Sequence, residues 1–259
     1  MTRNISQFDL TGRTAIVTGG GQGIGKGICL ALAQAGANIV VVELNPSTAE
    51  ATAREVEALG RKALAIRTDV RNREQIEAMV RQAVEVFGNI DILVNNAGGI
   101  GPEHFVAAME MSEFTWDDVV NNNLKSVFLC SQAVAKSMIE QKKGTIINIA
   151  SVAAFVGHPF CVPYGVSKAG VVNLTQTMAN ILGPHNIRVN AVAPGSIATK
   201  TREMIYVLHP ELAKLRQEAI PLGRIGTIEE VAWVVAFLAS DASAYISGQV
   251  IRIDGAASK

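Results

Sequence analysis

The sequence predicts one α/β domain: a doubly wound, mostly parallel sheet of about seven strands with helices on both faces. Its 259 residues suit a single large domain. Short runs rich in β-branched residues alternate with longer helical patterns, which is typical of a parallel sheet covered by helices. No linker, low-complexity tract or internal repeat interrupts this alternation. The strands are expected at residues 14–17, 39–43, 63–68, 90–94, 145–149, 188–193 and 250–254.

Local signals mark where the intervening helices begin and end. Ser47 with Glu50, and Thr227 with Glu230, have the spacing of capping boxes, in which each residue's side chain accepts a backbone N–H of the other. Glycine suits a helix end because it adopts the left-handed conformation easily. A glycine follows a helical pattern and precedes a strand at Gly36, Gly60, Gly88, Gly144 and Gly183. Residues 196–226 fit no strand or helix pattern, and we expect them to form a substrate lid at the carboxyl end of a strand.

The composition excludes several kinds of partner. The 23 basic and 23 acidic residues cancel, so no net charge is available to hold nucleic acid or an anionic membrane surface. Three cysteines without a CxxC pair indicate reduced thiols, and the four histidines show no metal-ligand spacing. Residues 1–12 are polar, and no apolar run reaches the roughly 18 residues of a membrane span. We therefore expect a cytoplasmic protein that binds no metal, nucleic acid or membrane.

A glycine-rich turn follows the first expected strand. Residues 18–25 read TGGGQGIG and lead directly into an apolar helical pattern, an arrangement in which backbone N–H groups and the helix N-terminus can bind a phosphate. The usual GxGxxG spelling is absent. Residues 20–26 also match GxxxxGK of NTP-hydrolysing enzymes, but Gly27 follows where that motif needs a magnesium-binding hydroxyl. A tight turn that binds nothing is the remaining interpretation.

The second expected strand ends at Glu43. An acidic side chain about 20 residues beyond a glycine turn can accept hydrogen bonds from a ribose diol, and it repels the extra phosphate of NADP. No basic residue stands at Gln22, Leu44 or Asn45 to attract that phosphate. The sequence therefore favours NAD over NADP. A solvated glutamate at a strand end, with no role in binding, is the alternative.

Tyr164 and Lys168 are four residues apart in a helical pattern and so share one face of the helix. A phenol with a pKa near 10 is a poor base at neutral pH, and lowering that pKa by about three units takes roughly 4 kcal/mol. An ammonium about 4 Å away at an effective dielectric of about 20 supplies roughly this energy. The pair is therefore a candidate acid–base unit, although the YxxxK spacing alone is common.

With five further motifs, these residues resemble the short-chain dehydrogenase/reductase family, whose fold is of the Rossmann type. The resemblance runs from Thr14 to Gly255. The matching motifs are Thr18-Gly19-x-x-x-Gly23-x-Gly25, Asn95-Asn96-Ala97-Gly98, Asn123 in the helix after Trp116, Ser151 thirteen residues before Tyr164, and Pro194-Gly195-x-x-x-Thr199.

The resemblance implies a role for each catalytic candidate. Tyr164 would exchange a proton with the substrate oxygen while hydride moves between carbon and nicotinamide. Lys168 would lower the phenol pKa and hold the nicotinamide ribose. Ser151 would hydrogen-bond the substrate oxygen. Asn123 would anchor a water that links Lys168 to solvent, and its neighbours Asn121 and Asn122 leave the local register slightly ambiguous.

The resemblance also implies which residues contact the dinucleotide. Asp69 and Val70 would meet the adenine, and Ile197 and Thr199 would hold the carboxamide. The full expected set is Gly19, Gln22, Gly23, Ile24, Gly25, Glu43, Asp69, Val70, Asn95, Ala97, Gly98, Tyr164, Lys168, Pro194, Gly195, Ile197 and Thr199.

The expected activity is therefore that of an NAD(H)-dependent oxidoreductase that interconverts a secondary alcohol and a ketone. Within the family, a 3-oxoacyl-thioester reductase and a hydroxysteroid dehydrogenase are alternatives, and the glycine-rich residues 97–102 are similar to the latter. Outside the family, an adenosylmethionine-dependent methyltransferase and a catalytically silent scaffold are alternatives. The resemblance further implies a homotetramer. Apolar side chains that would line the substrate pocket, or simply pack in the core, are Val152, Ala153, Phe155, Phe160, Met204, Ile205 and Leu208.

Overall fold

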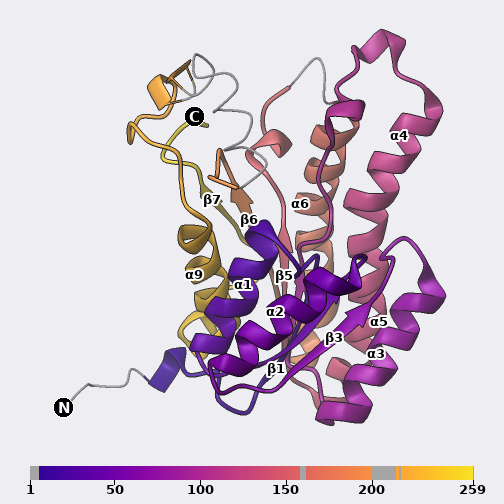
Figure 1. The fold of residues 1–259 in the computed structure, drawn as a ribbon, viewed down its shortest axis with the longest axis vertical. Coiled ribbons are helices and arrows are strands. Elements are labelled where there is room, and N and C mark those ends of the chain that lie inside the picture. Colours follow the sequence, from indigo (N-terminus) through magenta and orange to yellow (C-terminus); the bar gives the residue numbers. More distant parts are fainter. Residues whose placement is uncertain (1–5, 158–161, 200–213, 216, 259) are drawn as a thin grey trace.

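The computed structural model describes residues 6–157, 162–199, 214–215 and 217–258. Within these residues, seven parallel strands form one sheet in the order β3-β2-β1-β4-β5-β6-β7 (Figure 1). Their bounds are β1 Thr14–Thr18, β2 Asn38–Glu43, β3 Ala63–Arg67, β4 Ile92–Asn95, β5 Gly144–Ile149, β6 Ile187–Pro194 and β7 Val250–Ile253. The predicted fold class is confirmed, and each predicted strand lies within two residues of an observed one.

Helices cover both faces of the sheet (Figure 1). One face carries α1 (Gly23–Gln34), α2 (Pro46–Ala58) and α9 (Ile228–Ala239), and the other carries α3 (Arg73–Phe87), α5 (Ser126–Gln141) and α6 (Val162–Leu182). A shorter helix, α4 (Glu113–Val120), runs into α5 through the π-helical turn Asn121–Lys125. In the described ranges, no helix is both long and apolar enough to cross a membrane.

The pattern of β1 explains why the sheet is buried on both sides. Successive side chains of a strand point to opposite faces. Ala15 and Val17 accordingly pack in the cluster with α1, α2 and α9, whereas Ile16 packs with α3, α5 and α6. A parallel strand with a helix layer on each side must be apolar at every position, which is why these strands appear in the sequence as continuous β-branched runs.

The helix signals were only partly correct. Thr227 and Glu230 form the predicted capping box of α9, but Ser47 does not cap α2: Asn45 does, and its side chain accepts the Ser47 N–H. Because Pro46 fixes the first helical residue, the helix begins earlier than the Ser47 signal suggested.

Of the five glycines predicted to end a helix, three do so and two do not. Gly36, Gly60 and Gly88 have positive φ after α1, α2 and α3. After α5 the left-handed residue is Lys142 rather than Gly144, and after α6 it is Asn186 rather than Gly183. Gly144 instead begins β5, where an added Cβ would lie 2.5 Å from the Met138 sulfur.

Candidate active site

The predicted site residues gather at the carboxyl ends of the strands. The strand order reverses between β1 and β4, and the crevice outside such a reversal is where open α/β sheets bind ligands. Six neighbouring strands each end at or just before a candidate residue, in sheet order Asp69, Glu43, Gly19, Asn95, Ser151 and Pro194.

The glycine turn after β1 is shaped by close backbone contacts. Gly19 has φ 63°, and a Cβ there would lie 2.9 Å from the Ala97 Cα. A Cβ on Gly25 would lie 2.0 Å from the Gly19 carbonyl oxygen. Both positions therefore require glycine.

Thr18 and Asn96 join the glycine turn to the segment after β4. The Thr18 hydroxyl accepts the backbone N–H groups of Asn96 and Ala97, both at 3.0 Å. The Asn96 amide donates to the carbonyls of Thr18 at 2.9 Å and Gly19 at 3.0 Å. Two motifs that are far apart in the sequence thus form one rigid wall of the crevice.

The start of α1 fits an anionic group. Gly23 has φ 53°, and in the described part of the chain no atom lies within 4 Å of where its Cβ would be, so this side of the turn is open. Gln22 occupies the N-cap position, and among the described residues its side chain makes no capping hydrogen bond. The first-turn N–H groups of α1 therefore remain available to a phosphate, together with the positive end of the helix dipole.

The NTP-hydrolysing interpretation of this turn is wrong on steric grounds. A Cβ on Gly27 would lie 2.1 Å from the Ile228 Cγ2 atom, because α1 and α9 pack closely there. Position 27 has no room for the hydroxyl that a magnesium site would need.

Glu43 faces the glycine turn from the end of β2. Its carboxylate accepts the N–H groups of Gly21 at 3.2 Å and Leu44 at 2.8 Å, which fixes a negative charge beside the turn. The structure also places Arg67 next to it, because Arg67 is the register partner of Glu43 on β3. Positions adjacent to Glu43 in the chain give no signal for this cation, because only the pairing of β2 with β3 brings Arg67 to Glu43.

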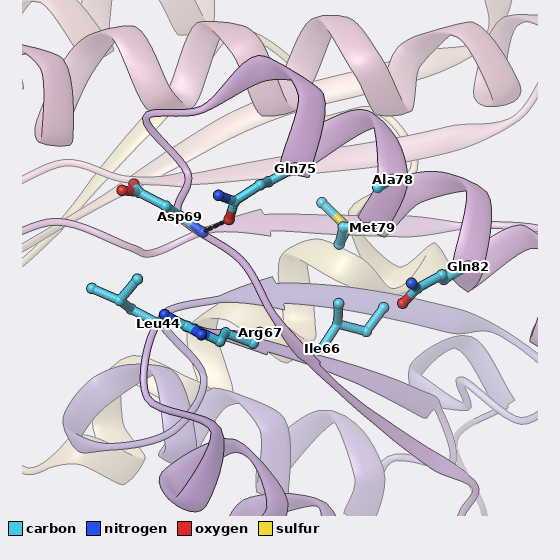
Figure 2. A pocket seen from close by; sticks show the side chains of 8 residues that line it. All are labelled: Leu44, Ile66, Arg67, Asp69, Gln75, Ala78, Met79 and Gln82. Carbon is cyan, nitrogen blue, oxygen red and sulfur yellow. Dashed lines mark hydrogen bonds between the residues drawn. The ribbon is translucent and has the colours of Figure 1, made fainter.

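A cavity of about 420 Å³ lies between the edge of the sheet and α3 (Figure 2). Leu44 and Asp69 stand at one end, and the Gln75 side chain accepts the Asp69 N–H at 2.8 Å. Val70 follows and is buried. The residues that line the cavity are Leu44, Ile66, Arg67, Asp69, Gln75, Ala78, Met79 and Gln82.

Asn95 turns its side chain into the protein rather than toward the crevice. It is 2% exposed and donates to Ser131 Oγ at 2.9 Å and Asn148 Oδ1 at 2.8 Å. Asn148 in turn donates to Thr175 Oγ1 at 2.9 Å. This chain joins β4, β5, α5 and α6, so only the backbone of Asn95 remains for the predicted contact near the ribose.

Asn123 lies in the π-helical turn and is fully buried, whereas Asn121 and Asn122 are half-buried. Its side chain accepts the Gly99 N–H at 2.7 Å and donates to the carbonyls of Gly99 at 2.8 Å and Val119 at 2.9 Å. Since the amide is used in these bonds, a water held by Asn123 would bind its backbone carbonyl. Turns of this kind interrupt the regular helix bonding and are frequent at functional sites.

Ser151 follows β5 directly and is half-buried. Its hydroxyl accepts the Ala153 N–H at 3.2 Å and so caps the short 3-10 helix Val152–Ala154. The first turn of α6 packs on this helix, since a Cβ on Gly165 would lie 3.2 Å from the Ala153 carbonyl. This contact brings Tyr164 to the segment that carries Ser151.

Lys168 is held inside the protein beside Tyr164. Its ammonium lies 5.6 Å from the centre of the Tyr164 ring and donates to the Ile149 carbonyl at 2.8 Å. The side chain is 3% exposed, and this burial lowers the pKa of Lys168 from its ordinary 10.5 to about 8. The ammonium is bound to the carbonyl of Ile149, two residues before Ser151, and lies beside the Tyr164 ring. A buried charge in this position can shift the pKa of neighbouring groups.

The end of β6 carries the last group of candidates. Gly195 donates to the Ile253 carbonyl at 2.9 Å, and a Cβ there would lie 2.8 Å from the Asp254 Cβ. Ile197 is 4% exposed and forms a bridge with Gly226, while Thr199 is half-buried. The predicted lid therefore begins and ends side by side. Its apolar candidates Met204, Ile205 and Leu208, like Phe160, lie outside the described residues.

Two free cysteines of the described residues lie outside the expected set of site residues. The Cys29 and Cys130 thiols are buried, which raises the pKa of both, that of Cys130 to about 12. Within the ranges that the structure describes, no group of three or more His, Cys, Asp or Glu side chains is arranged to hold a metal ion.

The fold and these groups define an oxidoreductase class that uses a nicotinamide cofactor on a Rossmann-type sheet. A family profile described as "Enoyl-(Acyl carrier protein) reductase" matches residues 19–257. The chain is 45% identical over 252 residues to 2-dehydro-3-deoxy-D-gluconate 5-dehydrogenase of Escherichia coli, with 97% of each chain covered. It is 44% identical over 246 residues to a 3-oxoacyl-(acyl-carrier-protein) reductase of Thermotoga maritima, covering 95% of this chain and 98% of that one.

A solved structure agrees with these relatives. The chain superimposes with a TM-score of 0.91 on a 7α-hydroxysteroid dehydrogenase complexed with NADH and 7-oxo glycochenodeoxycholic acid, at 36% identity and with 98% and 97% of the two chains covered. The protein therefore belongs to the short-chain dehydrogenase/reductase family, whose members are oxidoreductases of alcohols and ketones. This membership sets aside the methyltransferase interpretation.

Proposed function

We propose that the protein is an NAD(H)-dependent oxidoreductase that interconverts a secondary alcohol and a ketone, with Tyr164 as general acid and base. The observation that carries this proposal is the buried ammonium of Lys168 beside the Tyr164 ring, next to the segment of Ser151. At an effective dielectric of about 20, an ammonium roughly 4–6 Å from a phenolic oxygen contributes about 3–4 kcal/mol, enough to lower a phenol pKa by about two to three units. The tyrosine would then exchange protons near neutral pH.

Each residue has a separate task in this mechanism. The nicotinamide, when bound, accepts or supplies the hydride. Tyr164 takes the hydroxyl proton of the alcohol, or returns it to the ketone oxygen. Ser151 hydrogen-bonds the same oxygen and stabilises the charge that develops on it. Lys168 favours the phenolate, and the backbone carbonyl of Asn123 holds the water that resupplies protons.

The glycine turn and the strand ends would hold the cofactor. The open side of Gly23 and the N-terminus of α1 suit its diphosphate, together with Gln22 and Ile24. Glu43 suits a free ribose diol, and its fixed negative charge opposes a 2′-phosphate, which supports NAD over NADP. Beyond the ribose, Asp69 and Val70 would meet the adenine. Pro194, Gly195, Ile197 and Thr199 would hold the carboxamide.

The substrate would lie over Ser151 and Tyr164. Val152 and Ala153 are half-buried, and Phe155 is 40% exposed, so these side chains do not belong to the core and offer an apolar surface beside the reacting groups. Relatives named for a keto sugar acid, an acyl thioester and an oxo bile acid indicate which ketones to examine first. We also propose that the protein is a homotetramer, as the family resemblance implies, and that it is cytoplasmic, as its three cysteines without a CxxC pair indicate.

A direct assay tests the proposal. The protein would be incubated with NADH or NADPH and two kinds of ketone, an acetoacetyl thioester and 7-oxo bile acids. It would also be incubated with NAD or NADP and 2-dehydro-3-deoxy-D-gluconate, which offers a secondary alcohol at C5. Oxidation of the cofactor would be followed by absorbance, and secondary alcohols with NAD would report the reverse direction. We expect turnover with at least one ketone and a preference for NADH. Tight NADH binding without turnover on any member of the panel would favour the silent scaffold.

A further inference from the structure

Arg71, which the sequence analysis did not single out, holds the carboxylate of Asp69 at the adenine end of the crevice. Its backbone N–H and Nε donate to Asp69 Oδ1 at 2.9 and 3.0 Å, and its Nη2 donates to Oδ2 at 2.9 Å. A two-point guanidinium–carboxylate pair fixes orientation as well as charge. The same contacts hold the pKa of the Asp69 carboxyl below its usual value, so that Asp69 remains an ionised acceptor.

The guanidinium nitrogen of Arg71 that does not bond Asp69 contacts a different segment. Its Nη1 donates to Asp118 Oδ1 of α4 at 3.1 Å. The other oxygen of Asp118 lies 3.2 Å from His104 Nε2, and His104 Nδ1 accepts the Gly101 N–H at 3.1 Å. Nδ1 also lies 3.2 Å from Glu103 Oε1, and a neutral His104 that accepts the Gly101 N–H carries its proton on Nε2, facing Asp118.

These contacts lead to the β4–α4 loop, which is also bound by Asn123 of the π-helical turn. The loop between β4 and α4 begins at Asn96, and Asn123 binds both the N–H and the carbonyl of Gly99 in it. Hydrogen bonds therefore run from Asp69 through Arg71, Asp118 and His104 to the loop that Asn123 holds.

The exposure of these groups argues against a role in stability. The side chains of Arg71, Asp118 and Asp69 are 43%, 32% and 26% exposed. Ion pairs with this much solvent contact contribute only about 0–1 kcal/mol to folding. The bridge instead joins the β3–α3 loop, through Asp118 of α4, to His104 of the β4–α4 loop.

We propose that Arg71 is a positioning residue that couples the adenine end of the cofactor site to the β4–α4 loop. Arg71 aims the Asp69 carboxylate at the adenine, and through Asp118 and His104 it orders the loop that contacts Asn123. This inference rests on the proposed function, because it requires that the dinucleotide binds with its adenine at Asp69.

The test separates the two halves of the cofactor. Dissociation constants for ADP-ribose, which carries the adenine, and for reduced nicotinamide mononucleotide, which does not, would be measured by calorimetry. We expect Arg71→Gln and Asp118→Asn each to weaken ADP-ribose about fivefold and to leave the mononucleotide unchanged. The double variant should lose no more than the stronger single variant, since both changes interrupt one bridge. Arg71→Lys should recover little, because one ammonium cannot reproduce the fork.

Two neighbouring variants control for charge. Arg73→Gln removes a cation two residues away that bonds Gln132 instead, and Asp117→Asn removes an exposed carboxylate next to Asp118. Both should bind ADP-ribose like the wild type. Hydrogen exchange supplies a second readout: ADP-ribose should protect the amides of residues 99–104 in the wild type but not in Arg71→Gln.

The outcomes distinguish the two proposals. If the wild type binds ADP-ribose but Arg71→Gln binds it equally well, or no more weakly than Arg73→Gln does, the role of Arg71 is wrong while the proposed function stands. Equal weakening of the mononucleotide, or unchanged protection of residues 99–104 in Arg71→Gln, would also contradict the coupling. If the wild type binds neither ADP-ribose nor NADH, both proposals fail.

Discussion

The ammonium of Lys168 lies 5.6 Å from the centre of the Tyr164 ring and is tied to the carbonyl of Ile149. This one ammonium therefore links α6, which carries Tyr164 and Lys168, to the end of β5, which leads to Ser151. That charge has no carboxylate partner among the ion pairs of the described residues. Its electrostatic effect is directed at the phenol.

Tyr164→Phe tests the acid–base assignment. The ring and its packing remain, so NADH affinity should stay within about twofold, while kcat should fall by roughly 10²–10⁴, the usual contribution of a positioned proton donor. Steady-state kinetics and fluorescence titration of NADH would measure the two quantities. Tyr245→Phe is the matched control, because Tyr245 is fully exposed and far along the chain from the site. Undiminished kcat in Tyr164→Phe would remove the assignment.

The buried lysine makes a second prediction, about stability against pH. The pKa of Lys168 is about 8 in the folded protein and near 10.5 when the chain unfolds. Between these values the unfolded chain holds more protons, so this group makes the free energy of unfolding rise with pH from about 8 to 10.5. The full change is on the order of 3 kcal/mol.

Lys168→Met isolates that contribution. The free energy of unfolding of both proteins would be measured with denaturant at pH 7, 8, 9 and 10, which covers most of the interval between the two pKa values. The variant should be more stable than the wild type at pH 7, and this difference should shrink as the pH rises. Parallel curves for the two proteins would show that the ammonium is not desolvated in the folded state.

The Glu43 carboxylate makes a prediction about cofactor preference. In Glu43→Gln/Leu44→Arg, repulsion of the 2′-phosphate is removed and a cation is added, so the ratio of NADPH to NADH affinity should rise at least tenfold. Leu59→Arg adds the same cation at another exposed leucine and should leave the ratio unchanged. Wild-type preference for NADPH would instead mean that Arg67, the register neighbour of Glu43, outweighs it.

Thr18 makes a prediction about the wall of the crevice. Thr18→Val keeps the shape but leaves the N–H groups of Asn96 and Ala97 without their acceptor, which should cost about 1–3 kcal/mol of unfolding free energy. Thr145→Val is the matched control, because its buried hydroxyl has no hydrogen-bond partner among the described residues. It should be neutral or stabilising. Equal destabilisation by both changes would contradict the role of the Thr18 bonds.

Much of the fold and of the site was predictable from the sequence. The strands were found because a parallel sheet needs apolar residues on both faces, and this leaves continuous β-branched runs. The structure brings Gly19, Glu43 and Ser151 to one edge of the sheet, since the carboxyl ends of parallel strands meet there, and α6 places Tyr164 near Ser151; the roles of these residues stay predictions.

What could not be predicted depended on the order of the strands and on tertiary packing. Arg67 lies 24 positions after Glu43 in the chain, and only the pairing of β2 with β3 brings the two together. The inward direction of Asn95 depends on Ser131 and Asn148, which come from α5 and β5. The bridge between Arg71 and Asp118 joins the β3–α3 loop to α4 in the same way. Three consecutive asparagines, which are weak helix formers, were the available signal for the π-helical turn.

That turn also determines how the long helical rod from Glu113 to Gln141 is phased. A residue contributes about 100° of rotation in a regular α-helix, so the extra residue of a π turn offsets the two halves of the rod by about that angle. If the same residues were wound as regular α-helix, Val127, Cys130 and Val134 would rotate away from the interior that they now fill, whereas deleting one residue of the turn would restore regular pitch and keep them in place. The π-helical turn at Asn123 thus keeps the apolar face of α5 turned toward the interior.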